Sequence, residues 1–250
     1  MNYNFNDNTL LHSVMFNPFK LESILQNGIM SFNEASKSNF SFTRNTFGYN
    51  FDDYISMTRY MYVSFGDKNT SFYNYTLKGI SLIVENQDFI YNQNEMYFNY
   101  PDEVFVKDKV VKENIKGILL PLKYLDYLLE ELPMFNLKST SYVNIKHTCD
   151  DLINYLKTLN YDVNMPLYNI YLNDLYQVVL KLQKDENNSM LLEEFMECKI
   201  SLNEFIAKEV QNAFDKKFNK KITTLEEMAT FIAEKYNKKI YYIDNLKYVR

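Results

Sequence analysis

The strongest constraint on the fold is a change of hydrophobic pattern near residue 122. Residues 1–121 carry short runs rich in β-branched and aromatic side chains, separated by polar turns. Residues 122–236 instead repeat apolar side chains at helical spacing, as in DDLINYLKTL and LYNIYLNDLYQVVLKLQ. We therefore expect an α+β fold with two regions, 1–121 and 122–250, of which the second is mainly helical. The boundary is soft, because no low-complexity linker marks it.

The first half opens with a well-marked helix. Asn17 can cap it, Pro18 suits its first position and Gly28 can end it. An apolar stripe at helical spacing lies between these signals, formed by Leu21, Ile24 and Leu25. Short runs of strand-forming residues follow, and we predict strands at Phe40–Thr43, Tyr60–Phe65, Ile80–Val84, Val104–Val106 and Ile118–Leu120.

The second half predicts a series of amphipathic helices. Two stretches each place leucines on one face: Leu152, Leu156 and Leu159 in the first, and Leu172, Leu175, Val179 and Leu182 in the second. A longer helix is predicted from about Met190 to Phe214. The segment TTLEEMATFIAEKY begins with a capping box, Thr224 and Glu227, and KKIYYID after it is a possible last strand.

Composition narrows the class of protein. The hydrophobic share of 46% permits a sizeable core, and the formal net charge of −5 argues against a strongly basic nucleic-acid binder, although a local basic patch stays open. Cys149 and Cys198 have no zinc-binding spacing, so we predict no metal site and reduced thiols. The N-terminus lacks signal-peptide features, and no apolar run approaches the length of a membrane span. We expect a cytoplasmic protein without membrane contact.

Four sequence segments of the first half form an ordered set of motifs. LLHSVMFNPFKLESILQNGIMS contains His12, SFTRN contains Arg44, and PDEVFVKDKVVKENIKGILLP contains Glu103. Together with ISLIVENQDFIYNQ, these segments resemble ADP-ribosyltransferase-fold proteins, in particular bacterial and phage members. The resemblance covers roughly residues 9–121. It implies that the N-terminal half is a split β-sandwich that binds NAD.

The resemblance also implies a role for each of these residues. His12 would contact the ribose or the nicotinamide amide, Arg44 would lie near the pyrophosphate or the acceptor, and Glu103 would lie over the nicotinamide ribose. Breaking the nicotinamide bond leaves an oxocarbenium-like ribose, which a fixed carboxylate stabilises. Such a carboxylate can also orient the ribose 2′-hydroxyl or help to deprotonate the acceptor. Glu103 and Arg44 are therefore the predicted catalytic residues, and the predicted NAD-binding residues are His12, Ser41, Thr43, Tyr54 and Tyr60, with Tyr62 as a further aromatic candidate.

One departure from the family pattern affects the subclass. Many members carry their acid in a Glu-x-Glu or Gln-x-Glu motif, whereas Pro101 stands two residues before Glu103. This argues against the arginine-modifying toxins. It favours the members with a His, Tyr and Glu set, or toxins that modify nucleic-acid bases.

The function implied is mono-ADP-ribosylation of a macromolecular acceptor, in a toxin, phage-defence or counter-defence role. The acidic net charge slightly favours a protein acceptor over nucleic acid, and the helical half would recognise that acceptor, or a neutralising or target protein. The alternative is a non-catalytic protein that uses the same scaffold to block a host or phage protein. An NAD hydrolase without an acceptor is a third hypothesis. His12, Arg44 and Glu103 also have plain structural readings, as a half-buried strand residue, a surface cation and a solvent-facing carboxylate.

Overall fold

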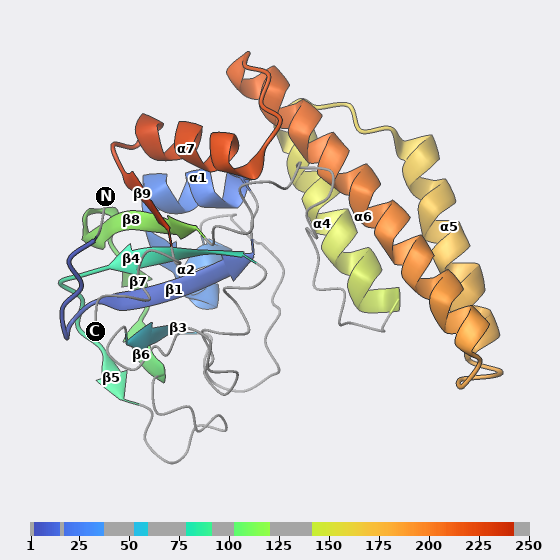
Figure 1. Cartoon of the computed structure of the whole chain (residues 1–250), viewed down its shortest axis with the longest axis horizontal. Helices are drawn as coiled ribbons and strands as arrows, with labels where there is room; N and C mark the ends of the chain where they lie inside the picture. Colours follow the sequence, from blue (N-terminus) through green and yellow to red (C-terminus); the bar gives the residue numbers. More distant parts are fainter. Residues whose placement is uncertain are drawn as a thin grey trace. The chain divides into compact units, whose positions relative to one another are not determined.

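The computed structural model describes residues 3–15, 18–37, 53–59, 79–91, 103–120 and 142–242. Over these residues the fold is α+β, with a mixed sheet and with helices in the C-terminal half, as the hydrophobic pattern predicts (Figure 1). The chain divides into two compact units. The first unit combines Met1–Asp126 with Leu225–Arg250, and the second unit is Tyr127–Thr224. In sequence, the second unit is thus inserted into the first.

The first unit is built on a sheet. Within the described part of the chain the sheet has seven strands in the order β5-β6-β3-β1-β4-β8-β9. Their bounds are Leu10–Met15 (β1), Tyr54–Arg59 (β3), Gly79–Val84 (β4), Ile90–Tyr91 (β5), Glu103–Lys107 (β6), Ile115–Leu120 (β8) and Lys239–Tyr242 (β9). Neighbouring strands are antiparallel except β8 and β9, which are parallel. A separate small sheet pairs β2 (Ile29–Met30) with β7 (Lys109–Val110), and a 3₁₀ helix, η2 (Lys112–Asn114), precedes β8.

Several predicted strands are confirmed. The segments Ile80–Val84, Val104–Val106 and Ile118–Leu120 lie within β4, β6 and β8, and KKIYYID contains β9. The predictions Phe40–Thr43 and Tyr60–Phe65 fall outside the described residues. The strand β3 was not predicted, because Ser56, Thr58 and Arg59 interrupt the apolar run of its sequence YISMTR.

The predicted early helix is confirmed as α1 (Pro18–Asn27), which buries Phe19, Leu21, Ile24 and Leu25. Gly28 follows it with a φ of +92°, and a Cβ atom there would lie 2.2 Å from the backbone oxygen of Val110. Only glycine fits this conformation and this close approach. The short helix α2 (Phe32–Lys37) comes next.

The C-terminal end of the chain returns to the first unit. Helix α7 (Leu225–Lys235) lies beside α1 (Figure 1), and Lys235 Nζ lies 2.6 Å from Oε1 of the buried Glu22. On β9, Tyr241 joins Leu11, Ile83 and Leu119 in one hydrophobic cluster. The sequence pattern places all of 122–250 in one helical region, whereas the structure groups Leu225–Arg250 with the sheet.

The second unit contains three long helices among its described residues. They are α4 (Tyr142–Thr158), α5 (Met165–Leu182) and α6 (Ser189–Phe218), and they confirm the helices predicted here. Asn164 and Asn188 cap α5 and α6 with their side-chain oxygens, and Asn219 ends α6 in the left-handed conformation. Leu152, Leu156, Leu172 and Leu175 of the predicted stripes are buried, whereas Leu159 and Leu182 are only half-buried and Val178 is buried in place of Val179. None of the described helices is long and apolar enough to cross a membrane.

Candidate functional site

His12 lies where two strands of the sheet part. Strand β1 pairs with β4 over its whole length, but it pairs with β3 only at Leu10 and Leu11. Directly after this short ladder, His12 Nδ1 lies 3.0 Å from the backbone oxygen of Ser56 on β3. A carbonyl oxygen only accepts hydrogen bonds, so Nδ1 carries the proton. The imidazole therefore continues the link between the strands where the backbone ladder stops.

The surroundings of His12 keep its ring neutral. Burial lowers the pKa of His12 to about 4, against the smaller opposing effect of the Ser56 carbonyl, and the Lys20 ammonium lowers it further. At neutral pH the ring then carries no charge, and Nε2 presents a lone pair. His12 is thus equipped to accept a hydrogen bond from a hydroxyl or an amide, rather than to bind an anion.

Glu103 begins β6 and is held by the same residue of β3. The Ser56 hydroxyl donates a hydrogen bond to Glu103 Oε1, and Oε2 of the carboxylate is shielded from solvent. In the β3–β6 ladder Thr58 pairs with Glu103 and Ser56 with Phe105. Ser56 and Glu103 are therefore diagonal neighbours on one face of the sheet, at a spacing that long side chains bridge.

The alternation of side chains along the strands shows which of these residues share a face of the sheet. Leu11 pairs with Thr58, so Leu11 shares a face with Ser56 and Glu103, while His12 projects from the other face. Ser56 contacts both residues. Its backbone carbonyl accepts a hydrogen bond from His12, and its hydroxyl donates one to Glu103. We call these three residues the Ser56 bridge.

Tyr54 adds an aromatic ring on the Glu103 side. It is half-buried, starts β3 and pairs with Lys107 at the end of β6. It stands two residues before Ser56, so the two side chains share a face and lie about 7 Å apart along the strand. A hydroxyl, a carboxylate and an aromatic ring thus occupy one stretch of this face.

The predicted site residues divide into two groups. The structure brings His12 and Glu103 together through Ser56 and places Tyr54 on the face of Glu103. The other candidates lie outside the described residues, namely Ser41, Thr43, Arg44, Tyr60 and Tyr62.

Sequence reasoning missed two residues of this region. Ser56 is exposed between buried Ile55 and Met57, and this alternation was its only signal. Lys20 on α1 is half-buried, and burial lowers its pKa. Lys20 also contributes, after burial, to the lowered pKa of His12. No local pattern distinguishes Lys20 from other helix lysines.

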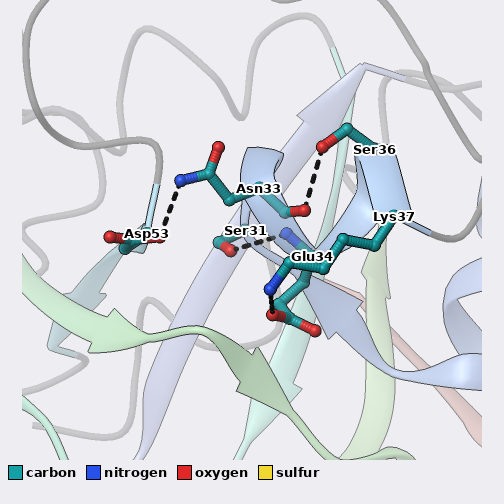
Figure 2. Close-up of polar contacts among 6 residues, drawn as sticks. All are labelled: Ser31, Asn33, Glu34, Ser36, Lys37 and Asp53. Atoms are coloured by element: carbon teal, nitrogen blue, oxygen red, sulfur yellow. Dashed lines mark hydrogen bonds and ion pairs between the residues drawn. The ribbon is translucent and has the colours of Figure 1, made fainter.

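A group of polar contacts fixes the start of β3 (Figure 2). On α2, Asn33 Nδ2 donates to Asp53 Oδ1 at 2.7 Å, and the two side chains point toward one another. The Glu34 backbone N–H donates to the hydroxyl of Ser31 at 3.3 Å. The Asp53 backbone oxygen accepts from the Asp108 N–H, and the Asp108 oxygen accepts from the Ser31 N–H. These contacts fix the chain just before β3, at Asp53, three residues before Ser56.

The site combines a neutral hydrogen-bond acceptor, a carboxylate held by a hydroxyl, an aromatic ring and a nearby ammonium. Among the described residues, no three side chains of His, Cys, Asp or Glu gather as they would around a metal ion. No family model and no curated protein matches the sequence. These side chains offer a hydrogen-bond acceptor on one face of the sheet and a carboxylate with an aromatic ring on the other.

Proposed function

We propose that this protein is an NAD-dependent mono-ADP-ribosyltransferase that moves ADP-ribose to a macromolecular acceptor. The observation that carries the proposal is the Ser56 bridge. It links His12 and Glu103, two residues picked out by separate motifs far apart in the sequence. If the two motif matches were coincidences, there would be no reason for His12 and Glu103 to bond to the same residue.

Glu103 has the chemistry that the reaction needs. The bond between nicotinamide and ribose C1′ breaks, its electron pair leaves with nicotinamide, and positive charge develops on the ribose. A carboxylate fixed beforehand stabilises this charge without reorganisation. The acceptor then bonds to C1′ and gives up a proton, which Glu103 can take. Ser56 keeps Oε1 in place for these steps.

His12 and Lys20 fit other parts of NAD. The neutral imidazole of His12 accepts a hydrogen bond, and both the ribose hydroxyls and the nicotinamide amide donate one. Lys20 acts electrostatically on His12. Burial disfavours its charged form, and the negative charge of a bound pyrophosphate would favour that form again. In this proposal Lys20 contributes to binding the pyrophosphate, which is the role expected of Arg44.

We also propose the finer features implied by the resemblance. The sheet would be part of a split β-sandwich, and the β1–β3 ladder, which has two residue pairs among the described residues, supports a divided sheet at the site. The acceptor would be a protein, in line with the net charge of −5. The role would be that of a toxin, a phage-defence protein or a counter-defence protein in the cytoplasm.

One observation favours a second candidate, a non-catalytic binding protein. The side chains of His12 and Glu103 project from opposite faces of the sheet. The two hydrogen bonds of Ser56 also serve as ordinary links between neighbouring strands. A scaffold that blocks a host or phage protein needs only this structural role.

Labelled NAD separates the two candidates. Purified protein is incubated with a bacterial lysate, and both nicotinamide release and label on macromolecules are followed for the wild type, Glu103→Gln and Glu113→Gln. Glu113 is an exposed carboxylate of η2 and serves as the matched control. We expect Glu103→Gln to reduce labelling about 100- to 1,000-fold and Glu113→Gln to leave it unchanged.

The remaining outcomes are also decisive. Nicotinamide release without transferred label would identify an NAD hydrolase. If the wild type neither releases nicotinamide nor transfers label, the transferase proposal is wrong. Protease and nuclease treatment of the labelled product distinguishes a protein acceptor from a nucleic acid.

A further inference from the structure

The longest helix of the second unit is covered unevenly along its length. Helix α6 has 30 residues, whereas α4 has 17, which corresponds to about 45 Å against about 25 Å. Helix α5 accompanies α6 over much of this length. Lys181 Nζ lies 3.2 Å from Glu194 Oε1 near one end, and the Asn164 N–H lies 3.1 Å from Glu209 Oε2 at the other.

A second side of α6 carries a row of residues at alternating spacings of three and four. Lys199, Asn203, Ile206 and Val210 of this row are all buried. Toward the start of the helix the same row continues through Met196 and Leu192, which are 42% and 46% exposed, and Ile200 beside it is 45% exposed. The side of α6 that is buried over its later turns is thus open over its first turns.

The start of α4 accounts for this change. Tyr142, its first residue, packs against Tyr176 of α5 with ring centroids 5.0 Å apart. Tyr176 lies about 7 Å along α5 from Lys181, which is level with Glu194 of α6. Since α5 and α6 run in opposite directions, α4 begins about level with Lys199. The first turns of α6, which carry the exposed apolar residues, extend past the start of α4 (Figure 1).

Acidic side chains follow the open apolar row. Glu193 and Glu197 stand one position after Leu192 and Met196, and Glu204 continues their line along the helix; all three are exposed. The one lysine in this part of α6, Lys199, is buried. The exposed basic residues of α6 belong to its second half, at Lys208, Lys216 and Lys217.

We propose that this surface docks a basic amphipathic helix of a partner protein. We call it the α6 face, made of Leu192, Met196, Ile200, Glu193, Glu197 and Glu204. Apolar residues of the partner would cover the row, and its lysines or arginines would meet the three glutamates. The flexible methionine suits contact with a helix from another chain. The proposal stands apart from the Ser56 bridge.

Charge argues against the other occupants. A second copy that covered the α6 face with its own would bring six glutamates together, three from each copy, and like charges at an interface are costly. Nucleic acid and anionic membranes would be repelled by the same side chains. A cationic, apolar helix satisfies both components of the surface.

Peptide binding tests the proposal. The probe is a fluorescently labelled amphipathic peptide of about 18 residues, with leucines at helical spacing and flanking lysines. A second peptide has glutamate in place of every lysine. By fluorescence anisotropy with the full-length protein, we expect the lysine peptide to bind at least about tenfold more tightly than the glutamate peptide.

Variants localise the binding. Leu192→Ser combined with Met196→Ser should weaken binding of the lysine peptide about tenfold or more. Ile170→Ser on α5, which replaces a 55% exposed apolar residue outside the α6 face, should leave binding unchanged. Combining Glu193→Lys, Glu197→Lys and Glu204→Lys should reverse the preference toward the glutamate peptide. Circular dichroism confirms that each variant keeps its helices.

Three results would overturn the proposal. One is failure of the wild type to bind the lysine peptide. Another is equal weakening by Ile170→Ser, which would show nonspecific apolar contact. The third is a wild-type dimer in sedimentation that Leu192→Ser converts to monomer, because the occupant would then be a second copy.

Discussion

The two units use their polar side chains in different ways. In the first unit, polar groups from strands distant in sequence meet inside the sheet, as His12 and Glu103 do at Ser56. In the second unit, polar pairs lie either one helical turn apart, as Lys146 and Asp150 do, or between neighbouring helices, as Lys181 and Glu194 do, around an apolar interior. Pairing between strands gathers polar groups at one residue, whereas the helices of the second unit leave the α6 face open for binding.

The largest effect is expected from core substitutions that test whether the two units unfold independently. Leu10 on β1 and Ile206 on α6 are both fully buried, and replacing either by alanine should cost about 2–5 kcal/mol. If the units unfold separately, Leu10→Ala should shift only the transition in which the sheet signal of circular dichroism is lost. Ile206→Ala should shift only the main loss of helical circular dichroism in urea.

A single shared transition, lowered equally by Leu10→Ala and Ile206→Ala, would contradict this division. The units would then be one cooperative body. An exposed position such as Asn173 on α5 provides the control, since Asn173→Ala should change neither transition.

The next effect concerns the pH dependence of the first unit. The folded pKa of His12 is lowered to about 4 from a reference of 6.5, so the unfolded chain binds more protons between these values. Stability contributed by neutral His12 is therefore complete above pH 6.5 and lost as pH falls toward 4. The slope attributable to His12 should not exceed about 1.4 kcal/mol per pH unit.

Variants isolate the contribution of this histidine. His12→Asn keeps a donor for the Ser56 carbonyl but does not titrate, so urea unfolding of this variant should depend less on pH in this window. His147→Asn, in the second unit, should leave the pH dependence of the first unit unchanged. Identical pH profiles for the wild type and His12→Asn would show that His12 does not titrate as the structure implies.

A smaller effect is expected from the contact that attaches α7 to α1 of the first unit. Glu22 on α1 is buried and accepts from Lys235 on α7 at 2.6 Å. Glu22→Gln removes the charge from this contact and should cost about 1–2 kcal/mol in thermal unfolding of the first unit. Glu34→Gln, which breaks an exposed pair with Lys37, should cost less than about 0.5 kcal/mol. Equal effects would show that the buried contact adds nothing to the attachment of α7.

The sequence predicted what depends on neighbours along the chain. The helices α1 and α4–α7 follow from periodicity and capping residues, which act within a few positions. His12 and Glu103 were predicted to form one site. Both contact Ser56, but their side chains leave the sheet on opposite faces, so the shared site stays a prediction.

What the sequence did not predict depends on strand pairing. Ser56 matters because β3 lies between β1 and β6 in a particular register, and no local pattern encodes that placement. The attachment of α7 and β9 to the first unit has the same origin. Segment 225–242 has ordinary helix and strand signals, and these do not specify which core it joins.

Our central proposal is that Ser56 serves catalysis by holding Glu103. Nicotinamide release is measured for the wild type, Ser56→Ala, Glu103→Gln and the double variant, with Ser36→Ala on α2 as the control. We expect Ser56→Ala to slow release about tenfold, the equivalent of one hydrogen bond to a charged group, and to have no further effect once Glu103 is glutamine. If Ser56→Ala slows release by the same factor in both backgrounds, or in neither, Ser56 does not act through Glu103 and the account is wrong.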